Sequence, residues 1–223
     1  MPAIKPPTVS KEVSDEITRA EGMHNFILAN MPDGFVSDTD VKIIVAALFS
    51  LTLEHHGAIL HLLKAGQFDG SAFALVRPLI EAAYRAHWVY ACAKPDIVTR
   101  LKNGEKVEPG LINMATEVEK KNDAGGIFAS IAPHIKVLHG YTHGGLQQMA
   151  RRFGATGDVQ PNYSDGAKIE AINATTAHVV MLAIAWCQIV STDAPDKEPR
   201  SKAITEHYMK IYPVPAVSET TAP

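Results

Sequence analysis

The stretch SAFALVRPLIEAAYRAHWVYACA, residues 71–93, decides the fold of this chain. It is apolar on nearly every side, and a helix with this composition lies in the interior of a protein. Arg77, Glu81 and Arg85 follow one another at four-residue intervals, so their side chains fall on neighbouring turns of one helix. Because an ionised group that leaves water without a partner is strongly destabilising, we expect these charges to be paired within the core.

Helical patterns continue on both sides of this stretch. Apolar runs are separated by Gly, Pro and Asp/Ser clusters, and the alternation typical of strands is scarce. We therefore expect an all-α fold, an antiparallel helical bundle with long core helices. The predicted helices cover 11–30, the residues from a Ser37 N-cap to Gly66, 71–93, 95–100, 109–121, a broken region over 127–153, 165–190 and 202–211.

The chain has the size and composition of a single folding unit. Its 223 residues suit one domain, and 46% hydrophobic with 20% charged residues is ordinary globular usage, which excludes wholesale disorder and fibrous repeats. We predict a helical bundle domain over residues 1–195. Residues 196–223 are predicted to form a charged linker, a short helix and a mobile, proline-rich C-terminal tail.

Charge and motif content exclude several classes of protein. A formal net charge of −3 argues against a surface built chiefly to hold nucleic acid, although Arg151 and Arg152 form a local basic pair. The N-terminus lacks a secretory h-region, and the charges and Pro78 make residues 71–93 a poor membrane span, so we expect a cytoplasmic protein without a membrane partner. Walker, dinucleotide-binding and nucleophile-elbow motifs are absent from the sequence, and no cofactor is expected.

The helix over 71–93 carries the first candidate site. With about 3.6 residues per turn, Arg77, Glu81, Tyr84 and Trp88 fall in one narrow stripe, and Arg85 lies at its edge. In a functional interpretation, Arg77 binds an anion with its planar fork, Glu81 acts as acid, base or ligand, and the aromatic rings stack on a ligand. In a structural interpretation, a buried Arg–Glu network joins neighbouring helices. Both interpretations remain open at this point.

A histidine cluster, PHIKVLHGYTHGG, carries the second candidate site, with His134, His139 and His143. On a continuous helix, His139 and His143 would be one turn apart and could hold a metal ion, but the glutamate of zincins is missing and glycines follow. No metal is therefore assigned. One alternative is a glycine-flanked turn that presents His139, Tyr141, Thr142 and His143 for catalysis or ligand contact, and another is ordinary packing at a helix end.

Together these features resemble a known group of proteins. The run Ala72–Ala82 (AFALVRPLIEA), followed by Leu138-His139-Gly140 and His143-Gly144-Gly145 before a final long helix, resembles uncharacterised bacterial helical proteins related to the HEPN superfamily, over about residues 40–190. The resemblance implies a dimeric helical bundle. Many HEPN proteins are metal-independent ribonucleases in toxin and phage-defence systems, with an arginine and a histidine about five residues apart.

The chain departs from that signature at one point. Asn173 and His178 keep the spacing, but Ile172 stands where the arginine would be. The leading hypothesis is thus a homodimeric, HEPN-like protein that binds an anionic, nucleotide-like or RNA ligand, with Arg77, Glu81, His139 and His143 catalytic and Tyr84, Arg85, Trp88 and Tyr141 contacting the ligand. The alternatives are a non-enzymatic helical interaction module and a metal-dependent enzyme that uses His139, His143 and a glutamate.

Overall fold

A computed structural model describes residues 9–31, 39–142, 146–153, 162–191 and 198–213. The expected all-α fold is confirmed, because these residues form helices and no β-strand. The elements are α1 (Lys11–Asn30), α2 (Asp40–Lys64), α3 (Asp69–Ala91), α4 (Pro95–Lys102), α5 (Leu111–Asn122), the 3-10 helix η1 (Ala129–His134), α6 (Ile135–Thr142), α7 (Leu146–Ala150), α8 (Asp165–Ser191) and α9 (Glu198–Ile211).

Side-chain caps define where the long helices begin. The hydroxyl oxygen of Ser10 accepts a hydrogen bond from the backbone N–H of Val13 at 3.3 Å, which satisfies a donor that the first turn of α1 leaves unpaired. Ser164 caps α8 in the same way. Both helices therefore start where the sequence predicts. In α2 the cap is Thr39, bonded to the N–H of Lys42 at 3.3 Å, and the predicted cap Ser37 lies outside the described residues.

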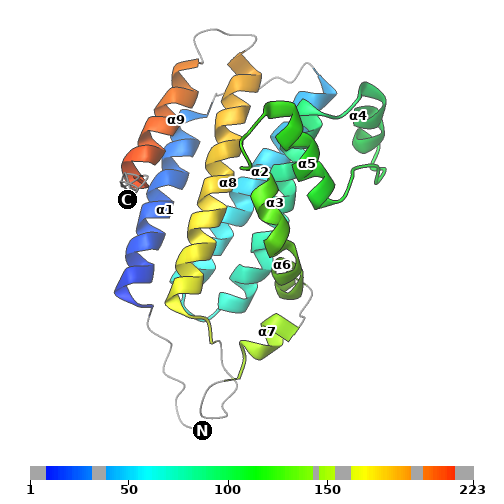
Figure 1. Cartoon of the computed structure of the whole chain (residues 1–223). Coiled ribbons are helices and arrows are strands. Elements are labelled where there is room, and N and C mark those ends of the chain that lie inside the picture. Colours follow the sequence, from blue (N-terminus) through cyan, green and yellow to red (C-terminus); the bar gives the residue numbers. More distant parts are fainter. Residues whose placement is uncertain (1–8, 32–38, 143–145, 154–161, 192–197, 214–223) are drawn as a thin grey trace, which may run out of the picture.

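Helix α3 is the centre of the fold, as its composition predicts. It packs against α2 along its length and also contacts α5, α6 and α8 (Figure 1). Leu79 and Ala86 are fully buried, and most other apolar side chains of α3 are buried with them. Burying one large apolar side chain contributes about 1.5–3 kcal/mol to the stability of a fold. Because so many side chains of α3 are buried, the hydrophobic core is organised around this helix.

Two of the shorter helices, α5 and α6, cover one flank of α3, whereas α4 packs against α2. Pro95 begins α4, where its missing N–H leaves no hydrogen bond unmade, and Gly110 precedes α5. The region predicted to be broken consists of η1, α6 and α7, and residues 143–145 between α6 and α7 lie outside the described residues. In Figure 1, α6 lies in front of α3, so residues of α6 reach α3 from a distant part of the sequence.

The last helix packs on the rest of the bundle. Helix α9 contacts α8 and α1, and the three lie side by side in Figure 1. Ile204 of α9 is fully buried and belongs to the same core as α3. The predicted linker and mobile tail fall largely on residues 192–197 and 214–223, which lie outside the described residues.

Two helices are long and apolar enough to cross a membrane by length and composition. They are α2 and residues 165–190 of α8, for which 33% and 56% of the most apolar window is buried in the fold. Core helices of soluble proteins pass the same test, so this property is weak evidence for a membrane. The lower buried share of α2 means that this helix carries apolar side chains on its exposed face, including Ile43 and Leu51.

Candidate functional site

Three of the predicted site residues meet on the surface of α3. Nε and Nη2 of Arg77 both lie 2.8 Å from Oε1 of Glu81, one helical turn along α3. Nη1 of Arg77 contacts Nδ1 of His139, which α6 carries across α3. We call these three residues the Arg77 cluster. It joins a cation, a carboxylate and an imidazole, three of the four residues that the leading hypothesis names as catalytic.

The charges are less buried than the sequence suggests. The side chains of Arg77 and Glu81 are 18% and 31% exposed, and His139 is exposed. The expectation of a charge line enclosed within the core is therefore wrong. Two faces of α3 are covered by α2 and α8, but the charged positions fall at the edge of the cover that α5 and α6 provide. The Arg77 cluster is thus accessible from solvent.

The guanidinium keeps capacity for a further ligand. It has five N–H bonds in a planar fork, and the contacts to Glu81 and His139 account for three of them. Arg77 also lines a cavity of about 210 Å³ together with Gly110 to Asn113 and Ile135. The first turn of α5 contributes unpaired backbone N–H groups to this region, and the helix dipole adds partial positive charge there. This side of Arg77 suits an anion.

Tyr84 and Trp88, the predicted stacking residues, are covered by other parts of the fold. The hydroxyl of Tyr84 donates to the carbonyl oxygen of Phe128 at 2.9 Å, and burial raises the pKa of this phenol above its usual range. Nε1 of Trp88 donates to Oε2 of Glu117 at 2.5 Å. Both rings lie on the same stripe as Arg77, but they are buried, so the accessible part of the stripe ends near Glu81.

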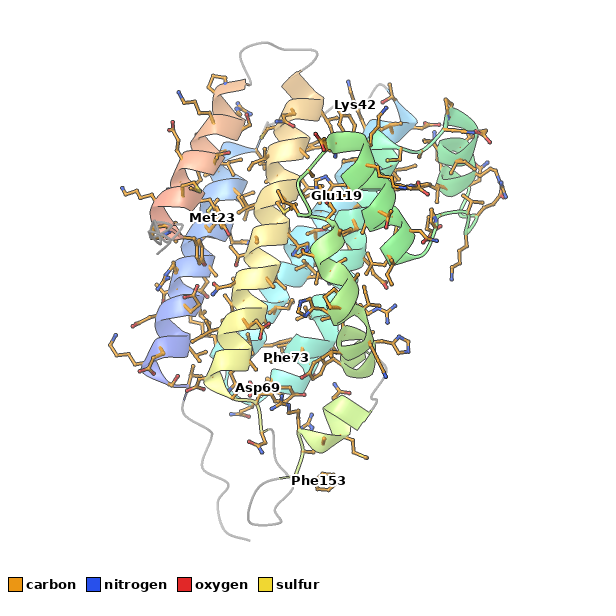
Figure 2. The ribbon with its side chains drawn as sticks, viewed as in Figure 1. Met23, Lys42, Asp69, Phe73, Glu119 and Phe153 are labelled. Atoms are coloured by element: carbon orange, nitrogen blue, oxygen red, sulfur yellow. The ribbon has the colours of Figure 1, made fainter. Side chains whose placement is uncertain are left out.

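Arg85 and Tyr141 also have partners within the fold. Arg85 forms an ion pair with Glu108 at 3.0 Å, which ties α3 to the segment before α5. The ring of Tyr141 is buried and lies 5.1 Å from the ring of Phe73, measured between ring centroids. Phe73, labelled in Figure 2, and Tyr141 line a second cavity where α3, α6 and α8 meet. The structure therefore does not bring Arg85 or Tyr141 into the Arg77 cluster.

Comparison with known proteins places the chain in a family. Residues 49–214, most of the chain, match the model of a family of unknown function, DUF6988. The chain belongs to this family. The match begins within α2 and ends just after α9, so the DUF6988 region includes every helix that contributes to the Arg77 cluster. No curated protein and no solved structure matches the chain.

Metal binding finds no support in the described part of this DUF6988 protein. No group of three or more His, Cys, Asp or Glu side chains in that part could hold a metal ion. His143, the predicted partner of His139, lies outside the described residues, as do Gly144 and Gly145. The hypothesis of a metal-dependent enzyme rests on the His139 and His143 pair and remains a prediction.

Glu119 is a positioning residue that sequence patterns did not indicate. Its carboxylate accepts hydrogen bonds from the backbone N–H groups of Gly126, Phe128 and Ala129, at 2.6, 2.8 and 3.3 Å. These bonds lower the pKa of Glu119. Figure 2 shows Glu119 on α5, beside the segment that leads to η1. The carboxylate therefore holds the segment that leads into η1. A lone, partly buried Glu on a helix carries no sequence signal for this role.

Proposed function

We propose that this protein is a cytoplasmic, homodimeric, HEPN-like antiparallel bundle that binds an anionic ligand, of RNA or nucleotide type, at the Arg77 cluster. The observation that carries the proposal is the meeting of Arg77, Glu81 and His139, residues from two helices far apart in the sequence. Glu81 fixes the plane of the guanidinium. The N–H bonds that remain on the fork match a phosphate group, which arginine binds in a bidentate manner.

Metal-independent RNA cleavage is the enzymatic form of this proposal. A phosphate that binds the remaining N–H bonds of Arg77 and also takes the N–H that now faces His139 displaces the imidazole and frees Nδ1 to accept the proton of the adjacent 2′-hydroxyl. The 2′ oxygen then bonds to phosphorus, the bond from phosphorus to the 5′ oxygen breaks, and the leaving oxygen takes a proton from water. Arg77 stabilises the charge that develops on the phosphate oxygens. The products are a 2′,3′-cyclic phosphate and a 5′-hydroxyl end.

The test is incubation of untagged protein with a labelled single-stranded RNA in the presence of EDTA. We expect cleavage with 2′,3′-cyclic phosphate ends, no cleavage of the corresponding DNA, and a loss of at least a hundredfold in Arg77→Lys and His139→Gln. Arg100→Lys is the matched control, because Arg100 forms an exposed ion pair with Glu105 at 2.8 Å. Absence of both cleavage and RNA binding would refute the proposal.

A second candidate function is a non-enzymatic helical interaction module. Three polar links follow one face of α3, namely Arg77 with Glu81 and His139, Arg85 with Glu108, and Trp88 with Glu117. A purely structural role is sufficient to explain these links, because they hold α5 and α6 in place. If the double variant Arg77→Met with Glu81→Leu keeps both the fold and binding of the physiological partner, the pair is structural and this second function is favoured.

A further inference from the structure

Two adjoining cavities lie on the other flank of α6, away from the Arg77 cluster. They have volumes of about 240 and 250 Å³ and share the lining residues Val76, His134, Leu138 and Glu170. The second of them, which we call the α8 cavity, is bounded by α3, η1, α6 and α8. Its apolar lining includes Ile80, Ile131 and Ala174. This lining favours the apolar body of a small molecule.

His134 at the rim of the α8 cavity carries a ring N–H, and the other polar side chains of the lining, His178, Ser130 and Glu170, present hydrogen-bond acceptors. Nδ1 of His178 lies 2.7 Å from the carbonyl oxygen of Ala174, and because a carbonyl only accepts, Nδ1 carries the ring proton. Burial lowers the pKa of His178, so the ring is neutral at pH 7 and its Nε2 is an acceptor. The hydroxyl proton of Ser130 is committed to the carbonyl oxygen of Ile127 at 2.7 Å, which leaves only lone pairs for a ligand.

Glu170 adds a negative charge to this acceptor set. Its exposed carboxylate lines both cavities and forms no hydrogen bond or ion pair with any described residue. Glu170 and His178 are two turns apart on α8, a separation of about 12 Å along the helix axis. A molecule bound between them therefore needs a cationic group at one end and a hydrogen-bond donor at the other.

We propose that the α8 cavity binds a small aromatic amine, with its ammonium group at Glu170 and a hydroxyl or N–H donor at Nε2 of His178. The ring packs between Val76, Ile80 and Leu138. The bound molecule satisfies the acceptors that the fold leaves unpaired in this cavity and neutralises Glu170. The site is distinct from the proposed anion site, because no residue of the Arg77 cluster lines the α8 cavity and Arg77 lines a separate cavity with Ile135.

The experiment is calorimetric titration of the full chain at pH 7.5 with three related probes. Tyramine has both polar groups, tyrosol has a hydroxyl in place of the ammonium, and 2-phenylethylamine lacks the phenolic hydroxyl. We expect tyramine to bind about tenfold more tightly than tyrosol, because its ammonium adds a charge-assisted hydrogen bond to Glu170. It should bind several-fold more tightly than 2-phenylethylamine, because its phenolic hydroxyl adds a neutral hydrogen bond to His178.

Two variants assign these differences to named residues. Glu170→Gln should remove the advantage of tyramine over tyrosol, and His178→Phe should remove its advantage over 2-phenylethylamine. Glu54→Gln, at an exposed carboxylate on α2, is the matched control and should change nothing. Arg77→Lys should also leave tyramine binding unchanged, which separates this site from the proposed function. The proposal is overturned if tyramine does not bind at millimolar concentration, if the three probes bind equally, or if neither variant alters their order.

Discussion

The guanidinium of Arg77 on α3 donates a hydrogen bond to Nδ1 of His139 on α6, although 62 residues separate them in the chain. Glu81 holds the opposite edge of the same guanidinium. A guanidinium only donates, so Nδ1 of His139 is the acceptor in this contact and the ring proton lies on Nε2. The contact therefore fixes the tautomer of His139 as well as its position, and it allows an incoming anion to exchange places with the imidazole.

The Arg77 and Glu81 pair should contribute little to stability. Both side chains are partly exposed, and ion pairs of this kind are worth about 1 kcal/mol or less because water screens them. A double-mutant cycle with Arg77→Met, Glu81→Leu and the double variant, measured by urea unfolding, should give a coupling free energy in that range. A coupling of several kcal/mol would mean that the pair is a structural element of the core, and would favour the interaction-module hypothesis.

Tyr84 should be a structural residue. Tyr84→Phe removes the donor to the Phe128 carbonyl oxygen and leaves a buried acceptor unpaired, so we expect a loss of about 1–2 kcal/mol in the free energy of unfolding. Tyr90→Phe, at an exposed position on the same helix, is the matched control and should be close to neutral. If Tyr84→Phe left stability unchanged but weakened RNA binding, Tyr84 would contact the ligand after all.

Glu119 should hold the segment before η1. Glu119→Gln weakens the hydrogen bonds from the N–H groups of Gly126, Phe128 and Ala129, because a neutral amide oxygen accepts less strongly than a carboxylate. Amide hydrogen exchange at these residues should become several-fold faster, while exchange in α1 and α8 should stay the same. Unchanged exchange at Gly126 and Phe128 would contradict the positioning role.

The buried histidine His56 should make the fold sensitive to acid. Oγ1 of Thr176 donates its proton to the Ile172 carbonyl oxygen at 2.7 Å. It is therefore the acceptor for Nε2 of His56 at 3.0 Å. Nδ1 of His56 then carries no proton and accepts from Nδ1 of His24 at 3.0 Å. Protonation of His56 at Nδ1 breaks this chain. Burial, reinforced by His24, lowers the pKa of His56 to about 3.

The sign of the effect follows from this lowered pKa. The unfolded chain takes up a proton on His56 near pH 6.5, whereas the folded chain resists it until about pH 3, so stability falls as the pH drops through this window. We expect a loss on the order of 1 kcal/mol per pH unit from this histidine alone. Urea unfolding at pH 7 and pH 5 should show a smaller pH dependence in His56→Gln than in the wild-type chain. An equal pH dependence in both would show that His56 does not contribute.

Local sequence signals were sufficient for the helices and for part of the site. The range 11–30 follows from its cap and its apolar spacing, and the contact of Arg77 with Glu81 follows from their four-residue separation, which needs no tertiary information. The contact of His139 with Arg77 depends on how α6 crosses α3. In the sequence, only the glycine-flanked motif around His139 marks this histidine as a candidate site residue. The apolar surroundings of Tyr84 indicated its burial, but its bond to the Phe128 carbonyl and the place of Glu170 at the two cavities depend on packing between distant segments, for which one sequence carries no signal.

The most direct test of the Arg77 cluster is calorimetric titration with a diribonucleotide monophosphate at low ionic strength. We predict that the wild-type chain binds it and that Arg100→Lys binds like the wild-type chain. Arg77→Lys should weaken binding at least tenfold, because an ammonium cannot bond Glu81 and a phosphate together as a planar guanidinium does. Equal affinity of Arg77→Lys and the wild-type chain, or no binding by either, would contradict an anion site at Arg77.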